Sequence, residues 1–214
     1  MTGWRIAGMG LRSTLIWFPL AALLNNFTMT GLLVIMGVAG HPKLAVAIGL
    51  VQGATLATFY VFSANARNLI LADHAGLIAN RLAQVRLLLM LPLAGIAYFL
   101  SATIGGVAST LALTLILRRA AEFMGEVSIA QHEYLNQHAS ARRTVFAEAV
   151  AFFLCLVLTI GFDVDLSLSA LPWALAPFVS IIGTGFSWKP SRPFDIRALS
   201  PHVGSTAIIG ICVY

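Results

Sequence analysis

The chain contains six long apolar segments joined by short polar connections, and no other feature restricts its fold so strongly. A segment of about 20 apolar residues, rising 1.5 Å per residue, crosses about 30 Å of hydrocarbon as a helix. Only 10% of the 214 residues are charged, against roughly a quarter in a soluble domain. We therefore predict an all-α, polytopic membrane protein with a six-transmembrane-helix bundle. The segments span residues 14–38, 44–66, 87–103, 104–130, 144–162 and 168–186.

Two other interpretations of these segments are weaker. Buried helices of a large soluble protein would show polar faces, and six successive segments almost without them do not. The first segment follows Arg5 and Arg12, as a cleaved signal peptide would. Its apolar run of about 25 residues exceeds a signal peptide's apolar core, however, and GVAG at 37–40 is a poor cleavage site. We expect a retained first span.

The basic residues predict the orientation of the spans. If successive connections alternate sides, the N-terminal side collects ten Lys and Arg and the opposite side only Lys43. Such an asymmetry indicates a cytoplasmic N-terminus in a multi-pass protein of the inner (cytoplasmic) membrane. The cations stand in ones and twos rather than in a stripe, so the formal charge of +5 does not indicate nucleic-acid binding. Arg118 and Arg119 fit neither side.

The motifs of catalysis and of cofactor binding are missing from the sequence. No GxxxxGK[ST] loop is present, so the chain has no nucleotide-hydrolysis motif. Cys155 and Cys212 lie in apolar runs without paired spacing, and no two His are spaced i,i+4 as a helical zinc site requires. We expect no enzyme activity, no cofactor and no metal.

The fourth segment holds the most unusual residues, in the stretch LRRAAEFMGEV. If its helix begins near Ile104, Arg118 lies about 21 Å along it, in the inner third of the hydrocarbon. Arg118, Glu122 and Glu126 follow i,i+4,i+8 spacing and should share one face, with Arg119 flanking Glu122. Such buried charges mark functional sites in membrane proteins. The alternative is snorkelling toward the headgroups, which fits Glu126 better than Arg118.

Other polar residues within the apolar segments are weaker candidates. Asn25 and Asn26 fall in the middle of the first span, where they could line a cavity or bond another helix. Arg67, at the cytoplasmic end of the second span, suits a phosphate or serves as a helix-end anchor. Glu148 stands about one turn into the fifth segment, and we interpret it as reaching the headgroups.

Small residues in the second segment predict close helix packing. Gly49 and Gly53 form a GxxxG motif, extended by Ala45 and Ala57 at the same spacing. Small side chains at this spacing allow another helix backbone to approach. We interpret them as a packing face rather than as a chemical site.

The C-terminal part follows a different pattern. Residues 187–201 form a polar segment that we expect in the cytoplasm. Residues 202–214 contain an apolar run of twelve residues, about 18 Å of helix, which is too short to cross the membrane. We interpret it as the start of a seventh span of a longer chain, with an interfacial or re-entrant end as the alternative.

Two stretches resemble one family of transporters. FSANARNLILAD at the end of the second segment and LRRAAEFMGEVSIAQHEYLNQ at the end of the fourth are similar to those of polysaccharide (O-antigen/exopolysaccharide) flippases. These belong to the multidrug/oligosaccharidyl-lipid/polysaccharide exporter superfamily, whose members have two six-helix lobes. The resemblance implies that this chain is the N-terminal lobe, and that its cargo is a lipid-linked anionic glycan moved across the cytoplasmic membrane.

A diphosphate crossing hydrocarbon needs fixed cations in place of water. We therefore predict that substrate binding involves Arg118, Arg119, Arg67, Asn25 and Asn26, and that ion coupling involves Glu122 and Glu126. A single lobe needs the missing second lobe or a second copy of itself, beside membrane lipids. Two alternatives remain: a multidrug or small-molecule exporter of the same architecture, and a non-transporting membrane assembly subunit in which Arg118 and Glu122 form a structural pair.

Overall fold

The structure is a computed structural model that describes residues 3–63, 66–73, 78–182, 184 and 186, with side chains from Ile16 onward. Within these ranges the chain is helical and contains no strand. Four helices are long and apolar enough to cross a membrane: Ile16–Val38, Pro42–Leu71, Ile78–Ile104 and His138–Gly161. The prediction of an all-helical membrane protein is confirmed to this extent, whereas the count of six spans is not.

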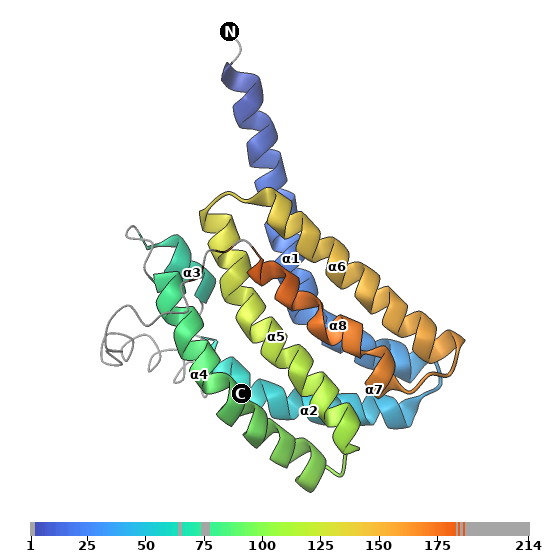
Figure 1. Cartoon of the computed structure of the whole chain (residues 1–214). Coiled ribbons are helices and arrows are strands. Elements are labelled where there is room, and N and C mark those ends of the chain that lie inside the picture. Colours follow the sequence, from blue (N-terminus) through green and yellow to red (C-terminus); the bar gives the residue numbers. More distant parts are fainter. Residues whose placement is uncertain (1–2, 64–65, 74–77, 183, 185, 187–214) are drawn as a thin grey trace.

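The helical elements follow one another in a simple order. They are α1 (Gly3–Val38), α2 (Pro42–Phe59), η1 (Tyr60–Phe62), α3 (Ala66–Leu71), α4 (Ile78–Tyr98), η2 (Phe99–Ile104), α5 (Ser109–Tyr134), α6 (His138–Leu156), η3 (Val157–Gly161), α7 (Leu166–Ser169), α8 (Leu171–Leu175) and η4 (Ala176–Ile181). In Figure 1, α4, α5, α8 and α6 form the near side of the bundle, and α1 and α2 lie behind them.

The turn between α1 and α2 has a clear local cause. Gly40 adopts a φ of +86°, which glycine reaches without a steric penalty. Pro42 then occupies the first turn of α2, where its missing N–H removes no helical hydrogen bond. The two helices consequently pack against each other as an antiparallel pair.

The third apolar segment begins earlier than predicted. Helix α4 starts at Ile78 rather than at residue 87. The residues before 87 include Asn80, Arg81 and Gln84, which suggested a polar connection. Ala79, Leu82, Ala83 and Arg86 are nevertheless buried, so that the polar residues occupy the other face of an amphipathic turn.

Helix α5 is the central element of the bundle. Its 26 residues give a length of about 39 Å. It packs against α1, α2, α3, α4, α6, α7, α8 and η4. It starts at Ser109, after a turn in which Gly106 has a φ of +67°, rather than near residue 104. Arg118 therefore lies about 14 Å from the start of α5, close to its midpoint, and not in the inner third.

The last predicted span, 168–186, is interrupted. Residues 166–181 form the short helices α7, α8 and η4, with proline in the first turn of both α8 and η4. Proline fixes its own φ and lacks an N–H, so each one starts a new helical segment. This apolar stretch, Leu166–Ile181, is shorter than the four long helices. The predicted linker 187–201 and seventh segment 202–214 lie outside the described residues.

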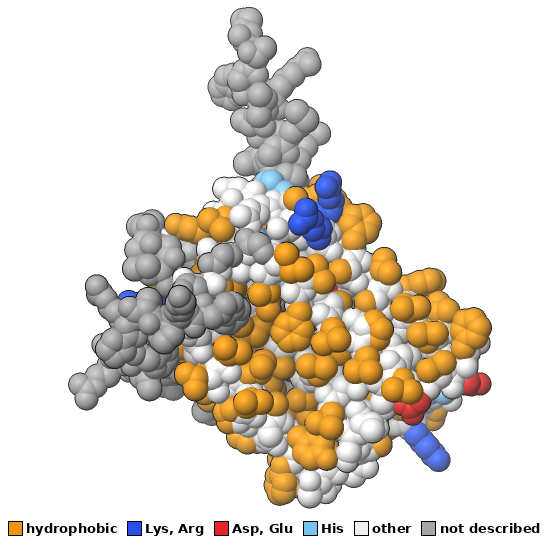
Figure 2. All heavy atoms as spheres, in the orientation of Figure 1, with side chains coloured by type: hydrophobic (Ala, Val, Ile, Leu, Met, Phe, Trp, Pro, Cys, Tyr) orange, Lys and Arg blue, Asp and Glu red, His pale blue; other side chains and the backbone are white. Residues whose placement is uncertain are grey.

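The surface of the bundle is apolar around its middle. Figure 2 shows hydrophobic side chains over most of the near face, with Lys and Arg gathered at one end and acidic side chains near the other. Leu88, Leu91 and Phe153 expose 69%, 77% and 68% of their surface. Patches of this kind face lipid in a membrane protein.

Candidate functional site

Arg118 lies at the centre of a buried ionic network, and its exposed fraction is 0%. Its Nε donates to Oε1 of Glu122 at 2.7 Å, and its Nη1 donates to the Trp173 carbonyl at 2.9 Å. Its Nη2 donates to Oγ1 of Thr28 at 3.0 Å and to Oε2 of Glu148 at 2.7 Å. The guanidinium group thus joins α1, α5, α6 and α8.

The charges in this network balance. Arg119 donates from Nη1 to the second oxygen of Glu122 at 2.8 Å, so Glu122 accepts from both arginines. Two guanidinium groups therefore stand against the carboxylates of Glu122 and Glu148. Glu148 has an exposed fraction of 0%, and the Arg119 side chain is 13% exposed. Because unpaired charge in a low-dielectric interior is costly, a balanced set can persist where a single arginine could not.

The acceptor on α8 is available for a reason that the sequence contains. In a continuous α-helix the Trp173 carbonyl would accept from the N–H of residue 177, which is a proline without that N–H. The carbonyl accepts from Ala176 within the tightened turn, and it also accepts from Arg118. The Trp173 ring lies 4.7 Å from Cζ of Arg118, a cation–π contact. Pro177 therefore helps to create the site.

Asn25 connects the network to α1. Its Nδ2 donates to the backbone carbonyl of Glu122 at 3.2 Å, and its side chain is buried. Gly125 lies beside it: a Cβ added there would meet Asn25 Oδ1 at 3.1 Å. The absence of a side chain at Gly125 thus allows α1 to approach α5 at the level of the ionic network.

A second polar cluster lies apart from the first and contains Glu126. The Arg86 guanidinium donates to the carbonyls of Phe123 and Ser63 and, at 2.9 Å, to Oε2 of Glu126. The Ser63 hydroxyl donates to the same Glu126 oxygen at 2.9 Å. Cζ of Arg86 lies 4.3 Å from the centroid of the Phe123 ring. This cluster joins η1, α4 and α5.

Helical geometry explains why the predicted ionic face divides. Eight residues of α-helix turn through about 800°, so Glu126 is rotated about 80° from Arg118 around the axis of α5. Arg118 and Glu122 face α1, α6 and α8, whereas Glu126 faces α4. The prediction that all three share one face is wrong for Glu126.

The remaining predicted residues lie outside the network. Arg67 forms a two-bond ion pair with Glu133, at 2.6 and 2.7 Å, and its side chain is 48% exposed. Asn26 is exposed, and its amide donates to the Ala22 carbonyl in its own helix. Gly49 packs against Leu33 of α1, but Gly53 has nothing near it. Of the predicted substrate residues, the structure brings together Arg118, Arg119 and Asn25.

Sequence reasoning missed three members of the two clusters. Glu148 was expected at the headgroups, but it lies inside the bundle against Arg118. Arg86 was counted among the cytoplasmic cations, but it is buried with an exposed fraction of 1%. An acidic residue within an apolar segment was a usable signal for Glu148. No local signal marked Thr28, since a lone threonine in a membrane helix usually bonds its own backbone.

A third cluster fixes the end of α5. His132, which is buried, donates from Nε2 to the Ser180 carbonyl at 2.6 Å, because a carbonyl oxygen can only accept. Its Nδ1 lies 2.6 Å from Oε1 of Gln137, which follows the end of α5. His132 therefore holds η4 against the turn between α5 and α6.

Several buried polar atoms near Arg118 have no hydrogen bond within the described part of the chain. They include Oε1 of Glu148 and Nε1 of Trp173. Such atoms are rare inside proteins and commonly indicate a bound group or a functional role. The indole N–H is a donor beside two guanidinium groups, a suitable set for oxyanions. Among the described residues, no cluster of His, Cys, Asp and Glu is arranged to hold a metal ion.

Comparisons with protein families, with curated proteins and with solved structures give no match to this chain.

Proposed function

We propose that this chain is a lobe of a membrane transporter that moves a polyprenyl-diphosphate-linked oligosaccharide from the cytoplasmic to the outer leaflet. The observation that supports this proposal is the position of Arg118 and Arg119. Both lie near the midpoint of the central helix, where a charged headgroup would be farthest from water. Arginine makes bidentate contacts with phosphate oxygens, and fixed donors there can replace the water that the diphosphate loses.

In the resting state the carboxylates of Glu122 and Glu148 occupy the positions that phosphate oxygens would take. Their oxygens accept from Nε and Nη2 of Arg118 at 2.7 Å. A diphosphate supplies oxyanions of the same type, so it can exchange with the carboxylates without leaving a bare guanidinium in hydrocarbon. Substrate binding is then a competition between two sets of anions for the same two arginines.

The displaced carboxylates require a positive charge of their own. A buried carboxylate without a partner takes up a proton or a cation, because the ionised form is strongly disfavoured there. Binding of the diphosphate would thus be linked to protonation or cation binding at Glu122 and Glu148. This linkage would couple transport to an ion gradient rather than to nucleotide hydrolysis.

The test measures binding of polyprenyl diphosphate to the full chain in lipid nanodiscs. We expect Glu148→Gln to bind more tightly than the wild type, by roughly tenfold, because it removes one competing anion. Arg119→Ala should weaken binding by at least as much. Arg142→Ala is the matched control, since Arg142 is exposed on α6, outside the network. Weaker binding by Glu148→Gln, or tight binding of a cationic drug instead, would contradict the proposal.

A structural role in a membrane assembly subunit is the second candidate. The observation that favours it is the number of protein partners of Arg118, because each of its three nitrogens already donates to an oxygen. For this role the network needs opposite charges but no particular arrangement of them. The exchange Arg118→Glu with Glu122→Arg would then preserve folding and assembly. A transporter would lose polyprenyl diphosphate binding in the same variant.

A further inference from the structure

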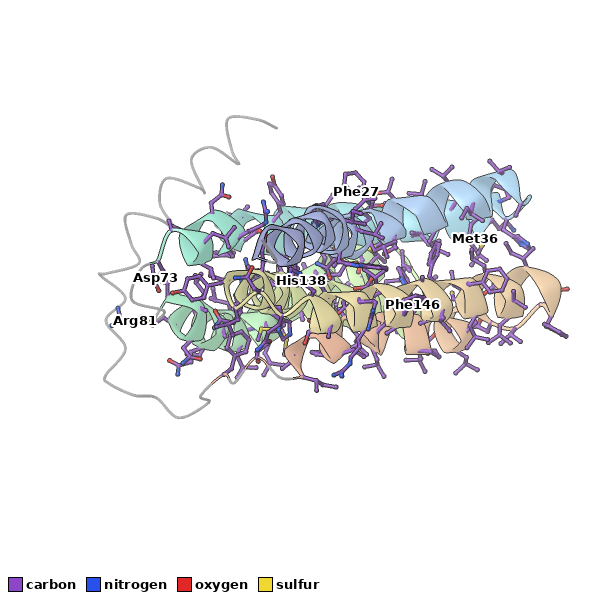
Figure 3. All side chains as sticks on the ribbon, turned by 90° about the horizontal axis from the view of Figure 1, so that it is seen from above. Phe27, Met36, Asp73, Arg81, His138 and Phe146 are labelled. Carbon is purple, nitrogen blue, oxygen red and sulfur yellow. The ribbon has the colours of Figure 1, made fainter. Side chains whose placement is uncertain are left out.

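The outer side of α1 and α2 differs from the rest of the lipid-facing surface. Its exposed residues, which we call the open face, are Leu23, Asn26, Phe27, Thr30 and Val34 on α1, and Val46, Leu50, Gly53 and Ala57 on α2. Gln52 links the two helices, since its Nε2 donates to Oγ1 of Thr30 at 2.7 Å. In Figure 3, Phe27 projects from α1 away from the layer that contains α6.

Polar groups of the open face lie at the depth of the bilayer centre. Asn26 is within one residue of the midpoint of the span Ile16–Val38, and Thr30 follows one turn later. Gln52 lies ten residues into α2, about 15 Å from its start. An amide has four hydrogen-bonding positions. The described bonds of Asn26 and Gln52 use one position each, both as donors.

Lipid tails cannot supply the remaining hydrogen bonds. Asn, Gln and Thr within membrane helices bond across to other helices for this reason. The other exposed residues of the long helices illustrate the contrast, since Leu88 and Leu91 on α4 and Phe146 and Phe153 on α6 are fully apolar. The open face is therefore suited to contact with protein rather than with lipid.

The open face also permits a close approach. A Cβ added at Gly53 would meet nothing within 4 Å, and Ala57 is exposed one turn further along α2. Gly49 differs, because a Cβ there would meet Cδ1 of Leu33 at 3.3 Å. The GxxxG motif is thus divided: Gly49 serves the packing of α2 on α1, and Gly53 is left for a helix from outside this bundle.

We propose that a second copy of this chain packs on the open face and forms a symmetric dimer with its axis along the membrane normal. Every copy has the same charge asymmetry, so all copies insert in the same orientation. An axis along the normal then brings each residue opposite its own counterpart at the same depth. Amides are self-complementary, since each donates and accepts. Between Ile16 and Phe59 the only charged residue is Lys43, near the start of α2, so the two faces carry little repulsion.

The first test counts subunits by single-molecule photobleaching of the full chain in liposomes of decreasing protein density. Gly53→Leu should raise the dissociation constant of the dimer at least tenfold. Gly95→Leu is the matched control, because Gly95 is also an exposed helical glycine with nothing within 4 Å of an added Cβ. It should leave the dimer unchanged. Asn26→Leu should weaken the dimer several-fold, in line with the strength of interhelical hydrogen bonds in membranes.

The second test is oxidative cross-linking in membranes, with Cys155 and Cys212 replaced by alanine. Thr30→Cys should give disulfide-linked dimers, and Leu88→Cys on the outer face of α4 should not. A wild-type chain that remains monomeric at every density would overturn the proposal, as would a dimer that tolerates Gly53→Leu or cross-links through Leu88→Cys. Reaction of monomeric Thr30→Cys with a membrane-impermeant maleimide would instead identify a water-filled passage. The proposal does not depend on transport, and these tests involve no substrate.

Discussion

Glu148 on α6 and Arg118 on α5 form an ion pair of 2.7 Å in which neither side chain is exposed. The pair joins two antiparallel helices at a point where water cannot take over for a lost partner. Arg67 and Glu133 form a pair at 2.6 Å whose arginine side chain is 48% exposed. The two pairs have similar distances but different surroundings, and this difference leads to the first prediction.

Glu148→Ala should destabilise the fold by about 3–5 kcal/mol, because it leaves part of the Arg118 charge uncompensated in the interior. Glu133→Ala, the control, should cost at most about 1 kcal/mol, because water replaces the lost carboxylate. Denaturant unfolding in detergent micelles measures both. Equal costs for the two substitutions would show that Arg118 reaches water when Glu148 is absent.

Trp173 contributes its ring and its backbone separately, so two substitutions should differ widely. Trp173→Phe keeps an aromatic face under Arg118 and loses only an indole N–H that has no hydrogen bond within the described residues, so we expect a cost of about 1 kcal/mol. Trp173→Ala also removes a fully buried ring and should cost about 3–5 kcal/mol. The same unfolding measurement applies, and a large cost for Trp173→Phe would indicate that the indole N–H is bonded in the membrane.

The Arg86–Glu126 and Arg118–Glu148 pairs should behave as independent sites. Arg86→Met strands the Phe123 and Ser63 carbonyls, and we expect a cost of about 2–4 kcal/mol. The double variant Arg86→Met with Glu148→Gln should lie within about 0.5 kcal/mol of the sum of the single variants, as for distant sites. A double-mutant cycle tests this expectation. A larger coupling would mean that α5 transmits changes between its two clusters.

Gly125 and Gly95 provide a prediction about packing. Gly125→Val should destabilise by about 1–3 kcal/mol, because the new side chain would meet Asn25 Oδ1, Pro177 Cβ and Ser180 Oγ. Gly95→Val introduces the same side chain on α4 where nothing lies within 4 Å, and we expect little change or a small gain. Comparison of the two melting temperatures in one detergent decides the matter. Similar melting temperatures would show that α1 and η4 can move away from α5.

The approximate positions of the helices followed from the pattern of the sequence, but their ends depended on contacts. Apolar length predicted the region of α1, α2, α4 and α6, since the bilayer thickness sets this length. The start of α4 was predicted too late because the buried face of its first turns becomes apparent only when α5 lies against it. In the last predicted span, prolines marked the interruptions correctly, yet only the structure showed how short the pieces are.

Spacing along one helix predicted the contacts within that helix and no others. Arg118, Arg119 and Glu122 meet because residues three and four apart on an α-helix are neighbours. The partners from other helices, Glu148 and Thr28, come from positions 30 and 90 residues away in the chain. No local pattern states which helices will be adjacent, so these partners could not be identified.

The sequence by itself determined that the chain folds into apolar helices and that charged residues interrupt one of them. The physical reason is that hydrocarbon requires every backbone group to be bonded within its own segment, so composition is enough to predict helices. Only the tertiary structure decided that this charged helix is the central one, that Glu148 faces Arg118, and that Glu126 belongs to Arg86. Those outcomes depend on how helices surround one another, because a buried charge is stable only where another helix brings its counter-charge within hydrogen-bonding distance.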